Sequence, residues 1–166
     1  GTGAVQAPAL LPFLPNLCRT LLGEELKLPS VSTWWCGQER ERKYVLDNLS
    51  RLVFKPAFPV RDSDPIFGSR LSKTELADLA QQILAAPAQW IAQEQINLSS
   101  APVIRGDALE PRRLVFRSYL TAVDGSAYSV MPGALTRITG STDSLIVSLQ
   151  KGGGSKDTWV LAGGLE

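Results

Sequence analysis

RLVFKPAFP, residues 51–59, joins an apolar run that favours a β-strand to a lysine, Lys55, at the end of that strand. A proline follows the lysine directly and fixes the backbone there. A polar loop over residues 60–72 comes next, contains Gly68 and Ser69, and leads into a helix. This order of strand, lysine, small-residue loop and helix is typical of a phosphate cradle. The alternative is an edge strand that ends in a solvated lysine, because the chain has no GxxxxGK[ST] motif at this point.

The helix after the loop is marked by a capping box, SKTE, at residues 72–75. Apolar residues at helical spacing follow it until Pro87 ends the helix. From residue 89 onward the period changes to two, which predicts strands. We expect these strands over residues 90–96, 112–122, 127–131, 136–138, 145–149 and 158–161. Asp124-Gly125 predicts a hairpin turn, whereas the KGGGS run at residues 151–155 predicts a flexible loop.

Upstream of the opening strand, the chain is expected to be mainly helical. Apolar residues at helical spacing predict one helix from residue 14 to a stop at Gly23, and a charged amphipathic helix is expected over residues 38–48. The aromatic-rich stretch between them, residues 30–37, reads as irregular. Helices followed by a mostly antiparallel sheet define an α+β fold, with helices flanking the sheet.

The composition excludes several classes of function. With 44% hydrophobic residues, 20% charged residues and a net charge of +1, the chain offers no electrostatic basis for binding nucleic acid. No apolar run approaches the length of a membrane span. Cys18 and Cys36 have neither metal-ligand nor disulfide spacing, which fits buried thiols in a reducing cytoplasm. The absence of histidine leaves lysine, arginine, carboxylates and bound metal to carry any chemistry, a set that suits phosphoryl transfer.

Five further positions carry polar groups on expected strands. In the predicted strand over residues 90–96, Gln93 and Gln95 point to one face and Glu94 to the other. A nucleobase amine or a ribose hydroxyl would satisfy a core-facing Glu94, and a solvent-facing Glu94 is the alternative. Arg117 lies on a mostly apolar strand, and Arg137 follows a Pro-Gly turn, so both could bind one anion. The alternative for Arg117 is the wet face of an antiparallel sheet.

The glycine run GGGSKD, residues 152–157, is the last candidate. Its backbone could wrap an anion with support from Lys156, and a mobile linker is the alternative.

Taken in chain order, these elements resemble the ATP-grasp ligases. Phrases similar to those of the circularly permuted ATP-grasp family are TWWCG, KPAFP, FGS, AQEQ, RSYL, MPGALTR and GGGSKDTWVL. The resemblance runs from the N-terminal segment to Leu161, nearly the whole chain. It implies an ATP-grasp-like nucleotide-binding region over residues 51–166, preceded by a helical segment over residues 1–50, both within a larger protein.

The resemblance also implies roles for individual residues. Lys55 matches the lysine that reaches the ATP phosphates, and Gly68 with Ser69 matches the loop that closes over them. The stretch from Gln93 through Glu94 to Gln95 matches the strand that meets adenine and ribose.

On the following strand, Arg117 matches the arginine that faces the γ-phosphate or the acyl phosphate, whereas Arg137 and Lys156 are looser matches. Ala134 stands where the family more often has a second glycine, so close approach of the backbone is in doubt there.

The family uses carboxylates and an asparagine to hold Mg²⁺ between the phosphates, and no such motif follows Arg137. Asp62, Asp64 and Asp157 are loop acids that could bind a metal or simply be solvated. We therefore expect most magnesium ligands outside this chain, and expect the chain alone to be catalytically inactive and to bind ATP weakly or not at all.

The whole enzyme would phosphorylate a carboxylate with ATP and let an amine attack the acyl phosphate. The rival interpretation is a non-catalytic interaction domain, in which Trp34, Trp35 and the proline-rich start would form an interface.

Overall fold

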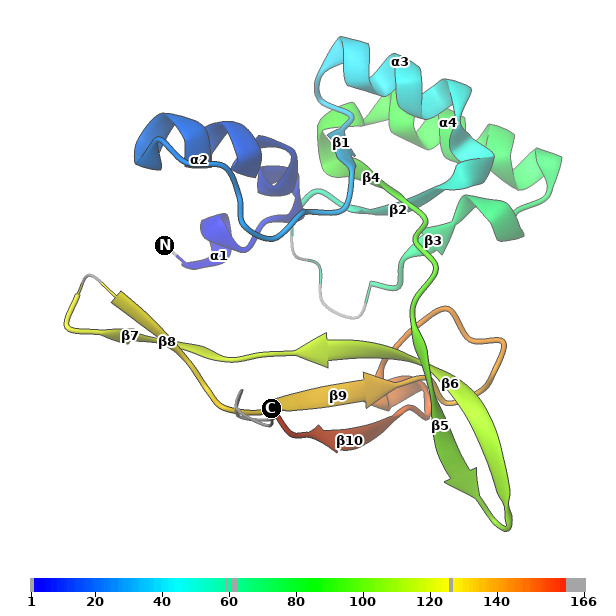
Figure 1. Cartoon of the computed structure of the whole chain (residues 1–166). Helices are drawn as coiled ribbons and strands as arrows, with labels where there is room; N and C mark the ends of the chain where they lie inside the picture. The colour runs from blue at the N-terminus through cyan, green and yellow to red at the C-terminus, as the bar shows by residue number, and fades with distance from the viewer. Residues whose placement is uncertain (1, 59, 61–62, 126, 161–166) are drawn as a thin grey trace. The chain divides into compact units, whose positions relative to one another are not determined.

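The computed structural model describes residues 2–58, 60, 63–125 and 127–160 (Figure 1). The chain divides into two compact units, Gly1–Ile96 and Asn97–Glu166. Helices combine with sheets in which every strand pair of the described residues is antiparallel, so the predicted α+β fold is confirmed. The predicted division by role at residue 50 stays a prediction. Within these residues no helix has both the length and the apolar character needed to cross a bilayer.

Unit 1 has a four-stranded sheet in the order β1-β4-β2-β3. Its strands are β1 (Thr33–Trp35), β2 (Leu52–Pro56), β3 (Ile66–Phe67) and β4 (Trp90–Glu94). Its α-helices are α1 (Thr2–Val5), α2 (Leu14–Leu22), α3 (Glu39–Asp47) and α4 (Lys73–Ala85), and short 3-10 helices lie at Pro8–Phe13, Leu49–Arg51, Gly68–Arg70 and Pro87–Gln89. Helices α2, α3 and α4 lie where the sequence predicts them, and α2 ends at Gly23 with φ +69°.

Helix α4 begins as its sequence requires. The Ser72 side chain accepts a hydrogen bond from the Glu75 backbone N–H, and the Glu75 carboxylate accepts one from the Ser72 backbone N–H at 2.8 Å. This reciprocal pair is the predicted capping box, which satisfies two donors that a helix start would otherwise leave unpaired. Helices α3 and α4 lie along the same face of the sheet (Figure 1).

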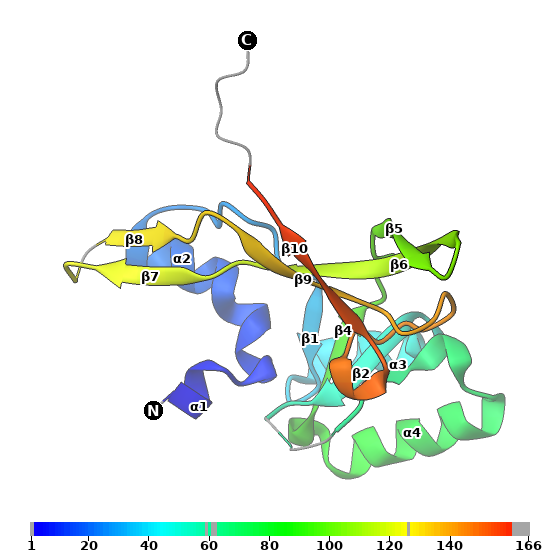
Figure 2. The same cartoon turned by 90° about the horizontal axis from the view of Figure 1, so that it is seen from below.

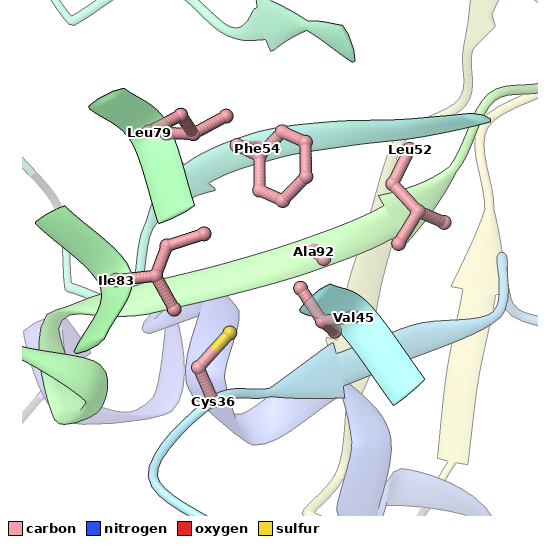
Figure 3. Packing of buried hydrophobic residues seen from close by; sticks show 7 residues of the cluster. All are labelled: Cys36, Val45, Leu52, Phe54, Leu79, Ile83 and Ala92. Atoms are coloured by element: carbon pink, nitrogen blue, oxygen red, sulfur yellow. The ribbon is translucent and has the colours of Figure 1, made fainter. Parts of the chain in front are cut away.

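The core of unit 1 lies between that sheet face and those two helices. Seven buried residues form it, and Figure 3 shows their side chains converging from both helices and the strands; they are Cys36, Val45, Leu52, Phe54, Leu79, Ile83 and Ala92. Phe54 and Ala92 face each other across β2 and β4 and are 0% exposed. Because successive side chains alternate between the faces of a strand, the intervening residues of β2 and β4 point to the other face.

Unit 2 contains a four-stranded antiparallel sheet, in the order β10-β9-β6-β5, and a separate hairpin. The sheet strands are β5 (Ser100–Arg105), β6 (Ala108–Arg117), β9 (Ala134–Ile138) and β10 (Gly154–Thr158), and a 3-10 helix lies at Leu149–Lys151. The hairpin joins β7 (Leu120–Val123) to β8 (Ala127–Val130) and extends beyond the four-stranded sheet (Figure 2). Asp124 and Gly125 both have positive φ, 50° and 74°, which confirms the predicted tight turn.

Three strand predictions for unit 2 are wrong in part. The single strand over residues 112–122 is divided, because β6 ends at Arg117 and β7 begins at Leu120. Residues 145–149 form no strand. The strand expected at 158–161 is β10, which ends at Thr158, and Leu161 lies outside the described residues.

The KGGGS run is also not the flexible loop that the sequence predicts, since β10 begins at Gly154 and pairs with β9. A Cβ at Gly153 would lie 2.5 Å from both the Ile138 and the Ser148 carbonyl oxygens. The reason for this glycine is therefore close packing against backbone.

Candidate functional site

Lys55 lies near the end of β2, which is an inner strand between β4 and β3, so the edge-strand alternative is wrong. Its side chain is half-buried on the sheet face opposite the α3–α4 core, and its Nζ donates a hydrogen bond to Gln93 Oε1 at 2.7 Å. Burial disfavours the charged ammonium and lowers the pKa of Lys55. The Lys55 ammonium is therefore partly shielded from solvent and lies beside a neutral amide.

The Gln93 side chain connects Lys55 to a third strand. Its Nε2 donates to Thr33 Oγ1 at 2.9 Å, and Thr33 is the residue directly opposite Gln93 in the β1–β4 register. The Thr33 hydroxyl in turn donates to the Val31 carbonyl oxygen at 2.8 Å. Gln93 is only 9% exposed, so its amide is held mainly by these protein partners. The sequence gives no signal for Thr33, because threonine is an ordinary strand residue.

A hollow of about 300 Å³ lies at Lys55, and Lys55 supplies the one charged side chain among the described residues that line it. These residues are Pro8, Lys55, Pro56, Phe58, Val60, Ser63 and Pro65. An ammonium in mainly apolar surroundings attracts an anion more strongly than it would in bulk water. The geometry of this hollow therefore favours a negatively charged group.

Glu94 points to the other face of the sheet, as the period of two predicts. It lines a second hollow of about 440 Å³ together with Ser32, Trp34, Tyr44, Asn48, Arg51, Leu52 and Gln95. The Trp34 and Tyr44 rings pack with their centroids 4.7 Å apart. Gln93 and Glu94 therefore serve different sides of the sheet. Gln95, which the sequence predicts on the face of Gln93, follows the end of β4 and lines the hollow of Glu94 instead, so that part of the prediction is wrong.

Gly68 and Ser69 begin the short 3-10 helix after β3. Gly68 is buried, and a Cβ at this position would lie 1.9 Å from the Leu49 carbonyl oxygen. Ser69 Oγ donates to Gln95 Oε1 at 2.7 Å. These contacts give Gly68 a packing role, and the predicted role of the pair in closing over phosphates stays a prediction.

In unit 2, Arg117 and Arg137 line one hollow of about 340 Å³, together with residues 147–150. Arg137 lies opposite Val115 across β6 and β9, so Arg117, two residues further along β6, shares its face of the sheet. Arg137 Nη1 also donates to Ser155 Oγ at 3.2 Å. Two guanidinium groups in one hollow make a suitable site for a phosphate or a carboxylate.

The remaining predicted cation, Lys156, lies on β10 and donates from Nζ to the Pro102 carbonyl oxygen at 2.7 Å. Its role as an anion ligand stays a prediction. The same holds for the convergence of Lys55 with Arg117, because these residues belong to different units.

Among the described residues, no three or more Asp, Glu, Cys or His side chains form a group that could hold a metal ion. Asp62, one of the loop acids considered above, lies outside the described residues.

Residues 1–139 match the family described as "Circularly permuted ATP-grasp type 2". The chain therefore belongs to the circularly permuted ATP-grasp family, and the resemblance seen in the sequence is confirmed. The family name implies ATP binding by members of the family.

Curated relatives agree with this assignment. The chain is 39% identical over 163 residues to the uncharacterized protein sll0335 of Synechocystis sp., and this match covers 98% of the chain and 34% of the relative. It is 36% identical over 162 residues to the uncharacterized protein Rv2411c of Mycobacterium tuberculosis, covering 98% of the chain and 29% of the relative.

A third relative, from Frankia casuarinae, bears the name "Putative glutamate--cysteine ligase 2-2". It is 36% identical over 160 residues, covering 96% of the chain and 18% of the relative. The chain thus spans between 18% and 34% of the length of these relatives.

Proposed function

We propose that the chain is the ATP-binding portion of a ligase that forms an amide or peptide bond through an acyl-phosphate intermediate. Membership of the ATP-grasp family supports the nucleotide, and the name of the Frankia relative supports the class of reaction. In this reaction a carboxylate oxygen attacks the γ-phosphorus of ATP and ADP leaves. An amine then attacks the acyl carbon, and inorganic phosphate leaves with the former carboxylate oxygen.

The contact between Lys55 and Gln93 is the observation that carries this proposal. The half-buried ammonium donates to a neutral carbonyl oxygen, and no described carboxylate lies within ion-pair distance of it. A buried charge without a counter-ion is unfavourable, and the lowered pKa of Lys55 expresses this cost. A phosphate oxygen in the adjoining hollow would provide the missing negative charge.

In unit 1, Lys55 would bind phosphate oxygens of ATP. In unit 2, the hollow lined by Arg117 and Arg137 would bind a phosphoryl group. Positively charged donors fixed before the reaction stabilise charge that develops on these oxygens. Glu94 and Gln95, which line one hollow, would position the base and ribose, and Gln93 would act on the opposite sheet face beside Lys55.

The same proposal includes magnesium as a cofactor, and a carboxylate and an amine as substrates. It also includes the remainder of the parent protein as a partner, and a cytoplasmic location. Because the described residues form no carboxylate cluster, we derive no step through magnesium. We expect the isolated chain to be catalytically inactive. Measurable single-turnover formation of ADP by the chain would contradict that expectation.

Thermal unfolding of wild type and of Lys55→Met in rising ATP with magnesium tests the nucleotide site. Methionine keeps much of the side-chain volume and removes the charge. A ligand that binds only the native state raises the unfolding free energy by RT ln(1 + [L]/Kd), or about 2.7 kcal/mol at 100 times Kd. We expect millimolar ATP to raise the melting temperature of wild type, and Lys55→Met to lose most of that rise.

Lys43→Ala is the matched control, since Lys43 is an exposed lysine on α3 and should leave the response to ATP unchanged. Adenosine is the control ligand, because it lacks the phosphates and should bind wild type and Lys55→Met alike. An equal response of both proteins to ATP would contradict the role of Lys55. No response to ATP from the full-length parent would favour the interaction domain.

A further inference from the structure

The hydrogen bonds around Gln93 form a directed chain that begins at Lys55. It runs from Lys55 Nζ to Gln93 Oε1 at 2.7 Å, from Gln93 Nε2 to Thr33 Oγ1 at 2.9 Å, and from Thr33 Oγ1 to the Val31 carbonyl oxygen at 2.8 Å. We infer that Thr33 is a positioning residue, which fixes the Gln93 amide so that its carbonyl oxygen holds the Lys55 ammonium ready for a phosphate. The inference rests on the proposed function of Lys55.

The direction of each hydrogen bond follows from which groups can donate. The Val31 carbonyl oxygen only accepts, so the single hydroxyl proton of Thr33 must point toward it. Thr33 Oγ1 then offers only lone pairs to Gln93, and the Gln93 NH₂ group must face Thr33. The Gln93 carbonyl oxygen is consequently left to face Lys55, whose ammonium only donates.

The reversed amide would fail at both ends. Its NH₂ group would face the Lys55 ammonium, placing donors against donors, and its oxygen would face a hydroxyl whose proton is already used by Val31. Gln93 is 9% exposed, so water would compensate such unpaired groups poorly. A buried carboxamide alone has two orientations, and the Thr33 hydroxyl selects one of them.

Strand pairing holds the three side chains in place. Thr33 and Gln93 are direct partners across β1 and β4, and Lys55 is the diagonal neighbour of Gln93 across β4 and β2. The other described residues that line the hollow at Lys55 carry no charge. The Gln93 carbonyl oxygen therefore orients the Lys55 ammonium, and the Thr33 hydroxyl fixes the orientation of the Gln93 amide.

The test uses Thr33→Val, which keeps the β-branched shape suited to a strand and removes the hydroxyl. In protein labelled with ¹³C at the lysine Cε, NMR titration gives the pKa of Lys55, and Lys55→Met assigns the resonance. A carbonyl acceptor stabilises the protonated amine, so loss of its fixed orientation should lower the pKa of Lys55 further. ATP affinity should fall about tenfold, with no change for adenosine.

Thr33→Ser restores the hydroxyl and should return both quantities to wild-type values, and Thr121→Val, at an exposed strand position in unit 2, should change neither. A wild-type pKa for Lys55 in Thr33→Val would overturn the inference. The pKa measurement needs no nucleotide. A lowered pKa in a chain whose full-length parent does not respond to ATP would therefore support the hydrogen-bond relay while counting against the proposed function.

Discussion

Substitution of Gly68 by alanine separates a packing role from a ligand-binding role at this position. A Cβ there would lie 1.9 Å from the Leu49 carbonyl oxygen and 3.0 Å from the Leu52 carbonyl oxygen. Both obstacles are backbone atoms, at the 3-10 helix Leu49–Arg51 and at the start of β2. Relief of the overlap requires a shift of one chain segment against another, and a new rotamer cannot provide it.

Overpacking of this kind costs 1–3 kcal/mol in typical cores, and a clash with rigid backbone belongs at the upper end, about 3 kcal/mol. With a urea m-value of about 1.5 kcal/mol/M, the unfolding midpoint should fall by about 2 M. The assay is urea unfolding followed by tryptophan fluorescence, since Trp34, Trp35 and Trp90 all belong to unit 1.

Gly3→Ala is the control, because no atom lies within 4 Å of a Cβ at Gly3 and its midpoint should not fall. A wild-type midpoint for Gly68→Ala, together with weaker ATP binding, would refute the packing argument. That result would assign Gly68 to the phosphate loop alone.

Two further predictions concern side chains in and beside the core. Burial raises the pKa of Cys36 to about 11, so about one Cys36 thiol in 10⁴ is ionised at pH 7. A thiol reagent should therefore modify Cys18 in the native protein, but Cys36 only after unfolding. Rapid labelling of both cysteines in the native protein would contradict this. Ser72→Ala should cost about 1 kcal/mol at neutral pH in a urea titration. Hydrogen bonds from the Ser72 backbone and side chain lower the pKa of Glu75, so this stabilisation is present above the ordinary pKa of the carboxyl and is lost as the pH falls through its lowered value. The difference between Ser72→Ala and wild type should therefore shrink in acid, and a constant difference would contradict the capping box.

Elements with a local cause could be predicted from the sequence. The SKTE box at residues 72–75 contains both partners of the cap, so it marks the start of α4 without knowledge of the fold. Asp124 and Gly125 tolerate the positive φ that a tight hairpin turn requires, so the prediction of the β7–β8 turn is also confirmed. In both places the interactions that decide the conformation join residues only a few positions apart.

Elements that depend on distant partners could not be predicted. Neither β5 nor the first part of β6 is predicted from the sequence, because each contains a proline, which argues against a strand. In the structure Pro102 and Pro111 are direct partners in the β5–β6 register, so the two missing donors lie opposite each other. The Gly-rich start of β10 has no side-chain pattern from which a strand could be predicted. The need for glycine follows only from the fold, because a Cβ at Gly154 would lie 3.2 Å from Ile138 Cδ1.

The residues of the candidate site also fall into two groups, those that local sequence predicts and those that only strand pairing brings together. The phosphate-binding role of Lys55 could be proposed because the lysine follows an apolar strand, and the opposed directions of Gln93 and Glu94 follow from alternation. Thr33 could not be found, because it lies 60 residues before Gln93 in a stretch that reads as irregular, and only the β1–β4 pairing brings the two together.

The hydrogen-bond partner of Lys55 bears on why the site would favour an anion. A carboxylate in place of Gln93 would neutralise the ammonium permanently, and a phosphate would then have to compete with a fixed counter-ion. The carboxamide instead directs the ammonium and leaves its positive charge uncompensated. Burial lowers the pKa of Lys55, and an arriving anion should raise it again, because an opposite charge favours the protonated form. With neutral Gln93 as its partner, the ammonium of the phosphate-free protein has a higher free energy than it would have in an ion pair. Binding of a phosphate removes this cost, so the binding free energy becomes more favourable.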